Sequence, residues 1–322
     1  MLNKILKEDK KYLLNNKVGN IYQLSNDPDV VTDGDIKYIG YEHIGKYYSG
    51  ESKVLSKHDI EKCEFISKYI GDGFLLDLAC GDGLYTVPLS FYNINIVAGD
   101  ISNKMLSILE YRAKINKINL DTVELCRINA LDLPFEDESF DFVIGNSFLH
   151  LISKPEIAIK EIYRVLKKGG KFLCFEDLPG QEHKMVNITE DEENKNKEHD
   201  KVLYEFENRY WSIIKGEYSL KQSMYSWKFN RDEACMKLFN TKEEILIECN
   251  SYKEKIDLWE SYLYRTSGKG FSSQSYIPDE IHKKVFNQVM DEFINKYGEE
   301  FYKNYTFTYA ISGIDKMIVY IK

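Results

Sequence analysis

The chain has 322 residues, and its content of 43% hydrophobic and 30% charged residues is typical of a soluble globular protein. Its formal net charge of −9 disfavours nucleic acid as a default partner. The sequence contains no apolar run near the roughly 18 residues of a membrane helix and no signal-peptide core, so we expect a cytoplasmic protein with no membrane partner.

The first 55 residues are expected to form an N-terminal cap. Apolar side chains recur near helical spacing over residues 2–14 and predict a short amphipathic helix. Residues 25–50 are rich in turn formers and predict a loop rather than a strand. Four tyrosines of this loop either cover a cofactor or pin a surface segment: Tyr38, Tyr41, Tyr47 and Tyr48.

Residues 56–178 are expected to form the core of the fold. A helix is predicted over 56–69, with Ser56 as its N-cap. Strands then alternate with helices, which indicates a doubly wound, mostly parallel α/β sheet with right-handed crossovers. The strands are predicted at 74–78, 94–99, 123–128, 140–145 and 172–175, and the helices at 83–92, 103–118 and 156–166.

The turn after the first core strand is suited to a ligand that touches the backbone. Ala79, Gly81 and Gly83 are small, and amides at the following helix N-terminus attract a negative group. A dinucleotide fingerprint fails in either register, because its third glycine is missing. Asp77, inside the strand end, suits a ligand with a positive amino group, such as S-adenosylmethionine (SAM). The alternative is an ordinary strand-to-helix glycine turn.

Asp100 is a second candidate, at the end of the next strand and 17 residues past Gly83. A carboxylate at this place can accept hydrogen bonds from both hydroxyls of a ribose. It would also serve as the N-cap of the following helix, and the two roles are compatible. Because a glycine turn precedes it, we favour the ribose role.

The pattern Asp77-x-Ala79-x-Gly81-x-Gly83 resembles the first motif of class I SAM-dependent methyltransferases, with Ala79 where that family usually has glycine. Four further stretches follow in the family's order: Arg127–Phe135, Ser139–Val143, Phe148–Leu151 and Tyr163–Gly170. Over residues 74–176 the chain is therefore similar to the methyltransferase type 11 subgroup. That resemblance implies a Rossmann-like methyltransferase fold and SAM as the cofactor.

The resemblance implies a role for each matched position. Gly81 and Gly83 would lie against the methionyl part of SAM, Asp100 would bind ribose and Ile101 would pack on adenine. Asn129 stands where the family has an acidic residue, and its side-chain oxygen can still accept the adenine amino hydrogen. The complete set of expected cofactor-binding residues is Asp77, Ala79, Gly81, Gly83, Asp100, Ile101, Asn129, Ala130 and Asn146.

Candidate catalytic and substrate-binding residues lie outside this set. His150 follows the fourth core strand, near the face where the methyl group points, and is a candidate proton acceptor. The alternative is a structural histidine hydrogen-bonded under the next helix. An aromatic helix is predicted over 258–264. It either contacts the methyl acceptor or is an ordinary packing helix. The candidate substrate contacts are Tyr38, Tyr48, Tyr262 and Arg265.

The remaining chain is expected to elaborate the core. Residues 179–240 are assigned to an insertion or lid, with a polar loop at 181–200 and an aromatic helix at 201–214. Residues 241–322 are expected to complete the sheet and roof the substrate. Within them, residues 241–258 are ambiguous between helix and strand, 278–297 predict a helix, and 305–311 and 317–321 predict antiparallel strands at the sheet edge.

The favoured function is methyl transfer from SAM to a small-molecule acceptor, with oxygen, nitrogen and carbon acceptors all open. Two alternatives remain, an RNA or tRNA methyltransferase and a non-catalytic SAM-binding partner protein. The six cysteines contain no C-x-x-C pair and lie in apolar segments, so we expect core thiols rather than metal ligands or disulfides.

Overall fold

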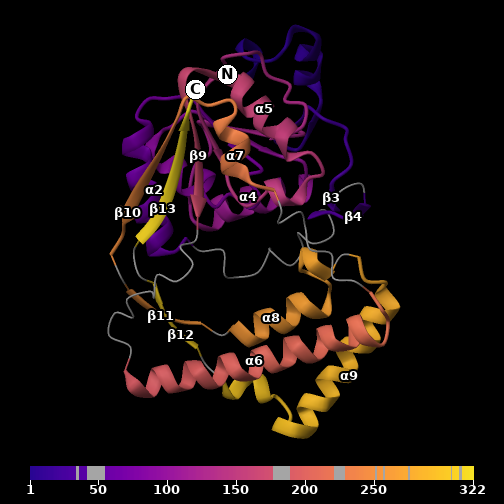
Figure 1. The fold of residues 1–322 in the computed structure, drawn as a ribbon. Coiled ribbons are helices and arrows are strands. Elements are labelled where there is room, and N and C mark those ends of the chain that lie inside the picture. The colour runs from indigo at the N-terminus through magenta and orange to yellow at the C-terminus, as the bar shows by residue number, and fades with distance from the viewer. Residues whose placement is uncertain are drawn as a thin grey trace. The chain divides into compact units, whose positions relative to one another are not determined.

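The computed structural model describes residues 1–33, 36–41, 55–176, 189–220, 229–250, 252–256, 258–274, 276–305, 307–311 and 314–322. The chain folds into two compact units (Figure 1). The first unit consists of Met1–Pro179, Tyr225–Cys249 and Gly313–Lys322, and the second of Gly180–Met224 and Asn250–Ser312.

The first unit is built on a nine-stranded sheet in the order β1-β2-β7-β6-β5-β8-β9-β13-β10. The six strands from β2 to β9 in this order pair in parallel, and β1, β13 and β10 are antiparallel to their neighbours. Their bounds are β1 (Lys17–Val18), β2 (Ile21–Gln23), β5 (Leu75–Leu78), β6 (Ile96–Asp100), β7 (Val123–Arg127), β8 (Phe140–Gly145), β9 (Leu166–Glu176), β10 (Thr241–Glu248) and β13 (Ile314–Ile321). The predicted α/β class and the mostly parallel sheet are confirmed.

Helices cover both faces of this sheet, because its central strands are apolar on both sides. Leu75 packs into the core that contains residues of α2, α3 and α4, whereas Leu76 and Leu78 pack into the core that contains residues of α5 and α7. The bounds are α2 (Lys57–Ile70), α3 (Thr86–Leu89), α4 (Asn103–Ile115), α5 (Pro155–Val165) and α7 (Arg231–Met236). This side-chain alternation across β5 produces a three-layer α/β/α unit.

The predicted start of α2 is confirmed at Ser56. Its hydroxyl accepts a hydrogen bond from the amide of Asp59, and the Asp59 carboxylate accepts one from the amide of Ser56. This reciprocal pair satisfies two backbone donors that the helix would otherwise leave open.

The N-terminal segment departs from its predicted structure at two places. Residues 2–14 form two 3-10 turns, η1 (Leu2–Lys4) and η2 (Glu8–Asn15), instead of one amphipathic helix. Residues 25–50 contain the antiparallel pair β3 (Val30–Asp33) and β4 (Ile36–Ile39), so the prediction of a loop without strands is wrong there. The reason lies in the two runs rich in β-branched residues on either side of Asp33-Gly34, a hairpin signal.

The second unit is mainly helical and has its own aromatic core. Its helices are α6 (Glu190–Gly216), α8 (Leu258–Ser267) and α9 (Asp279–Tyr297), and a separate pair of strands joins β11 (Tyr252–Ile256) to β12 (Phe307–Ile311). The fully buried side chains of this core include Phe206, Trp259 and Phe301. Arg209 holds α6 to α9 by two hydrogen bonds of 2.7 and 2.8 Å to Glu292.

Two predictions for this part of the chain are corrected. The expected polar loop at 181–200 is helical from Glu190 onward, where Thr189 caps α6 and acidic residues fill the first turn. Negative charge at a helix N-terminus is favourable, so this acidic run starts the helix; residues 181–188 lie outside the described part. The strand expected at 305–311 pairs with β11 and not with the main sheet, whose edge strand is β10. In the described parts of the chain, no helix is long and apolar enough to cross a membrane.

Candidate functional site

A cavity of about 470 Å³ lies in the first unit, at the carboxyl ends of β5, β6 and β8. At β5 the strand order reverses, since β6 and β7 lie on one side of it and β8 and β9 on the other. Ligands of open α/β sheets bind outside the strand ends at such a switch point. Its described walls include Asp27, Asp29, Tyr41, Ala79, Gly81, Asp82, Asp100, Ile101, Met105, Asn129, Ala130, Asn146, Phe148 and Leu151.

The turn after β5 brings backbone to the cavity wall through unusual dihedral angles. Ala79 has φ +56° and Gly81 has φ +54°, and both residues line the cavity. The left-handed conformation costs an alanine on the order of 1 kcal/mol or more, so Ala79 is a strained residue at the site. Gly83 has φ +83° but faces the protein interior, where an added Cβ would lie 2.6 Å from Leu109 Cγ. Gly83 therefore permits close packing of the turn against α4.

Asp77 lies beneath this turn and is only 2% exposed. Its carboxylate accepts hydrogen bonds from the amide and the hydroxyl of Thr86, the first residue of α3. Burial raises the pKa of Asp77 to about 6, against the lowering effect of these two bonds. Asp77 is not among the described residues that line the cavity. It lies under the turn and supports it.

The buried position of Asp77 predicts a pH-dependent effect on stability. Its pKa of about 6 in the folded chain exceeds the ~3.9 of an unfolded aspartate, so the folded state holds the proton longer. Stability attributable to this group therefore falls as the pH rises from about 4 to 6. We expect Asp77→Asn to gain free energy of unfolding relative to wild type over that window, as measured by urea unfolding. A difference that does not change between pH 4 and 7 would contradict it.

Asp100 ends β6 and faces the cavity. Its two carboxylate oxygens accept hydrogen bonds of 2.9 Å from the amides of Gly81 and Ser102. The N-cap of α4 is Ser102, whose hydroxyl accepts from Met105, so the suggested capping role of Asp100 is wrong. Burial, with the charge of Asp29 as a smaller contribution, raises the pKa of Asp100 to about 7. A ligand that donates hydroxyl hydrogens would stabilise its carboxylate form.

Asn129 follows β7 and holds a carboxylate from a distant part of the chain. Its side-chain oxygen accepts from the amide of Leu131, and its Nδ2 donates to Asp27 Oδ2 over 2.8 Å. Arg127 donates to the backbone carbonyl of Asp27. These contacts lower the pKa of Asp27, the hydrogen bond from Asn129 being the largest cause. The side chain of Asp27 therefore brings an acidic group to the cavity wall beside Asn129.

The cavity wall is rich in acidic side chains. Four aspartates contribute to it, and the described lining residues include no lysine, arginine or histidine: Asp27, Asp29, Asp82 and Asp100. Two of these aspartates have a cation near them: Arg112 Nη1 lies 3.6 Å from Asp82 Oδ1, and the charge of Arg127 acts on Asp27. A wall of this kind favours a ligand that carries positive charge.

The loop after β8 forms another wall of the cavity. Asn146, Phe148 and Leu151 line it, while His150 lies between two of them in the 3-10 turn η6 (Leu149–Leu151) and is not itself a lining residue. Burial lowers the pKa of His150 below its ordinary value, so the imidazole is neutral at pH 7. A neutral imidazole keeps a nitrogen lone pair, as a proton acceptor requires.

The candidate substrate contacts are divided between the two units. In the first unit Tyr41 lines the cavity, Tyr38 belongs to β4, and Tyr48 lies outside the described residues. In the second unit Tyr262 packs edge-on against Phe206 and Trp259, and burial raises its pKa. The Arg265 guanidinium lies 4.3 Å from the ring centre of Phe271. Both second-unit side chains thus contact its aromatic core, and their role toward an acceptor stays a prediction.

The core of the first unit is similar to known proteins. Residues 76–174 match the family model described as a methyltransferase domain. Over 104 residues the chain is 36% identical to demethylmenaquinone methyltransferase of Oceanobacillus iheyensis, covering 31% of this chain and 43% of that protein. Over 145 residues it is 34% identical to the enzyme of the same name from Symbiobacterium thermophilum, covering 42% and 57%. The match thus spans about half the length of these relatives.

A solved structure, a putative methyltransferase from Bacillus halodurans, aligns with 82% of this chain and 98% of its own, at 19% identity and a TM-score of 0.43. The family match coincides with the stretch in which the five sequence motifs occur, at residues 74–176. The resemblance predicted from those motifs is confirmed.

Proposed function

Because residues 76–174 match the methyltransferase domain model, we propose that the chain transfers the methyl group of SAM to a small-molecule acceptor. The observation that carries the proposal is the cavity at the strand switch point, where the Asp100 carboxylate and the Gly81 turn meet over a 2.9 Å hydrogen bond. A carboxylate beside a glycine turn is the combination that binds a ribose and its neighbouring groups in doubly wound sheets. The acidic wall suits the positive sulfonium of SAM.

The cavity wall contains chemically suitable residues for both the adenosyl end and the methionyl end of SAM. We assign Asp100 to the ribose hydroxyls, and the apolar side chains of Ile101 and Met105 to the adenine ring. The methionyl end is assigned to the backbone of Ala79 and Gly81, where small residues admit close approach. Of the nine cofactor-binding residues expected from the sequence, the assignment uses four: Ala79, Gly81, Asp100 and Ile101. It leaves Asp77 and Gly83 beneath the turn.

Asp27 is assigned to the adenine amino group. Asn129 already uses its oxygen on Leu131 and its amide hydrogen on Asp27, so the carboxylate of Asp27 is the charged acceptor in this part of the wall. A hydrogen bond to a charged acceptor is worth about 1.5–3 kcal/mol. We expect Asp27→Asn to weaken SAM binding by about 10-fold in calorimetry.

A cofactor analogue without the adenine amino group provides the control for Asp27. If the carboxylate acts on that group, the analogue binds wild type and Asp27→Asn with the same affinity. An equal loss for SAM and for the analogue would show that Asp27 only positions the N-terminal segment.

Bound SAM would supply an electrophilic methyl group, so the chain has to orient the acceptor and exclude water. A base is needed only where the acceptor carries a proton. We propose His150 for that task, since it is neutral at pH 7 and adjoins the lining residues Phe148 and Leu151. Tyr41 adds an aromatic surface with a polar tip to the same wall.

The acceptor is proposed to be a small, preferably aromatic molecule. The relatives named above methylate demethylmenaquinone, but their similarity covers only the core, so the acceptor itself is not transferred to this chain. The net charge of −9 disfavours the RNA alternative. The acceptor class can be tested with methyl-labelled SAM and a panel of quinols, phenols, amines and total tRNA.

The expected outcome of that panel is label transfer to a small molecule, with release of S-adenosylhomocysteine. Label in tRNA would replace the small-molecule assignment by the RNA alternative. Binding of SAM without label transfer to any acceptor would favour a non-catalytic SAM-binding protein.

A further inference from the structure

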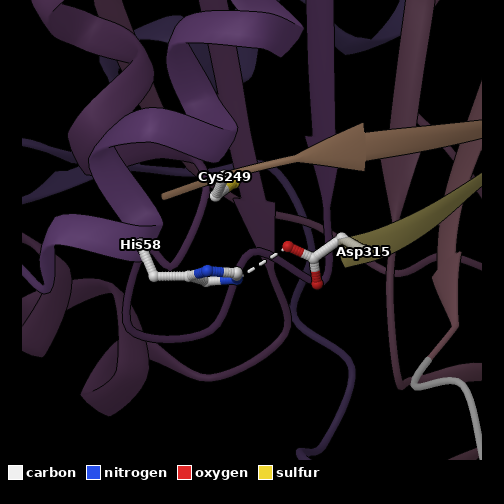
Figure 2. A group of neighbouring side chains, drawn as sticks. All are labelled: His58, Cys249 and Asp315. Carbon is white, nitrogen blue, oxygen red and sulfur yellow. Dashed lines mark ion pairs between the residues drawn. The ribbon is translucent and has the colours of Figure 1, made fainter. Parts of the chain in front are cut away.

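Three side chains with metal-binding atoms meet in the first unit, away from the lining of the SAM cavity: His58, Cys249 and Asp315 (Figure 2). Their ligand atoms all lie within 4.8 Å of one another, and His58 Nε2 is 2.7 Å from Asp315 Oδ2. His58 lies in the first turn of α2, Cys249 directly follows β10, and Asp315 lies at the start of β13. We propose that this cluster binds a divalent transition metal, with Zn²⁺ as the best fit.

The donor chemistry selects this class of ion. A thiolate, an imidazole and a carboxylate are the three ligand types of zinc sites, whereas Mg²⁺ and Ca²⁺ prefer oxygen ligands alone. Ligand atoms in a tetrahedral zinc site lie roughly 3.3–3.7 Å apart. The His58–Asp315 separation of 2.7 Å is shorter than these values, and the other separations do not exceed 4.8 Å, so side-chain adjustments of about an ångström would close the site.

Charge balance requires the thiolate as well as the carboxylate. Lys62 is a buried cation whose Nζ lies 3.9 Å from Asp315 Oδ2. Its positive charge would repel a bound dication. The negative charges of Cys249 and Asp315 together neutralise Zn²⁺, with His58 as a neutral ligand. A site with three protein ligands leaves a fourth position to water or another small ligand.

Cys249 differs from the other five cysteines in its exposure to solvent. Those five are buried, whereas Cys249 is partly exposed and so accessible to an ion from solution. The sequence prediction of core thiols therefore holds for five of the six. This thiol adjoins an imidazole and a carboxylate that come from sequence positions 58 and 315.

The position of the cluster along the chain gives the metal a structural role. Cys249 is the last residue before the chain enters the second unit at Asn250, and Asp315 follows soon after it returns to the first unit at Gly313. His58 belongs to α2, which packs on the sheet of the first unit. A shared ion would fix both crossing points to the first unit, independently of any methyl transfer.

The test uses the whole chain, stripped of metal with a chelator, and the metal ion alone. We expect one Zn²⁺ or Co²⁺ per chain, and a thiolate-to-Co²⁺ charge-transfer band in the near ultraviolet. Cys249→Ser should abolish that band and weaken Zn²⁺ binding by at least about 10- to 100-fold, a loss that even outer partners of a ligand can cause. Asp315→Asn should weaken binding similarly.

Cys235→Ser is the matched control, because Cys235 is a buried thiol of α7 that packs in the other core of the first unit. It should keep the band and the affinity of wild type. Zn²⁺ should also slow alkylation of Cys249 in the native chain, as mapped by mass spectrometry, which requires no variant. The proposal is overturned if Zn²⁺ does not bind, if Cys249→Ser keeps the band, or if alkylation is unaffected by Zn²⁺.

Discussion

Replacing Asp100 by alanine is expected to weaken SAM binding by about 10- to 150-fold, the equivalent of 1.5–3 kcal/mol for hydrogen bonds to a charged acceptor. Asp100 faces the cavity at the end of β6, and its carboxylate is held in place by the amides of Gly81 and Ser102. A ribose bound there loses its acceptor in the variant. The measurement is isothermal titration calorimetry of SAM into each protein.

The control for Asp100 is Asp121→Ala, an exposed aspartate in the turn before β7 that is absent from the described lining of the cavity. It should bind SAM as wild type does. Unchanged SAM affinity in a folded Asp100→Ala chain would remove Asp100 from the binding site. Unfolding curves of both variants establish that each is folded at the titration temperature.

Replacing Gly83 by alanine is expected to lower the free energy of unfolding by about 2–4 kcal/mol. Two causes add, because Gly83 has φ +83° and a new Cβ would lie 2.6 Å from Leu109 Cγ and 2.7 Å from Val87 Cγ2. Both neighbours are buried, so neither side chain moves aside without disturbing the core between α3 and α4. Urea unfolding monitored by circular dichroism measures the loss.

Gly71→Ala separates the two causes. Gly71 ends α2 with φ +58°, and an added Cβ there meets no atom within 4 Å. Its variant should therefore lose only the backbone contribution, about 1–3 kcal/mol, because φ +58° with ψ −133° is sparsely populated by residues that carry a Cβ. If Gly83→Ala costs no more than Gly71→Ala, close packing at the turn is not what position 83 provides.

The core of the first unit could be predicted from sequence because its signals are local. The strands β5, β6 and β8 contain short apolar runs, and α3, α4 and α5 each lie between two consecutive strands of the sheet, so a single α/β pattern explains this order. The pairing of β12 could not be predicted, because residues 307–311 look equally suited to either sheet. Its partner β11 is chosen by contacts between segments more than 50 residues apart in sequence.

In the candidate site, too, some residues could be predicted from the sequence and one could not. Gly81 and Asp100 follow from their places at strand ends and Asn129 from the family resemblance, and all three line the cavity. Asp27 was missed as a site residue, because it precedes its hydrogen-bond partner Asn129 by 102 residues and the sequence marks it only as part of an Asp-Pro turn. One signal in the sequence pointed to such a residue. Asn129 stands where the family has an acidic residue, and a missing acidic group suggests that another part of the chain supplies it.

The most direct test of the account is a calorimetric titration of SAM into the whole wild-type chain. The account predicts saturable binding of one SAM per chain, which S-adenosylhomocysteine displaces and which Asp100→Ala weakens. The absence of saturable binding by a folded chain would contradict the assignment of the cavity at the ends of β5, β6 and β8 to this cofactor.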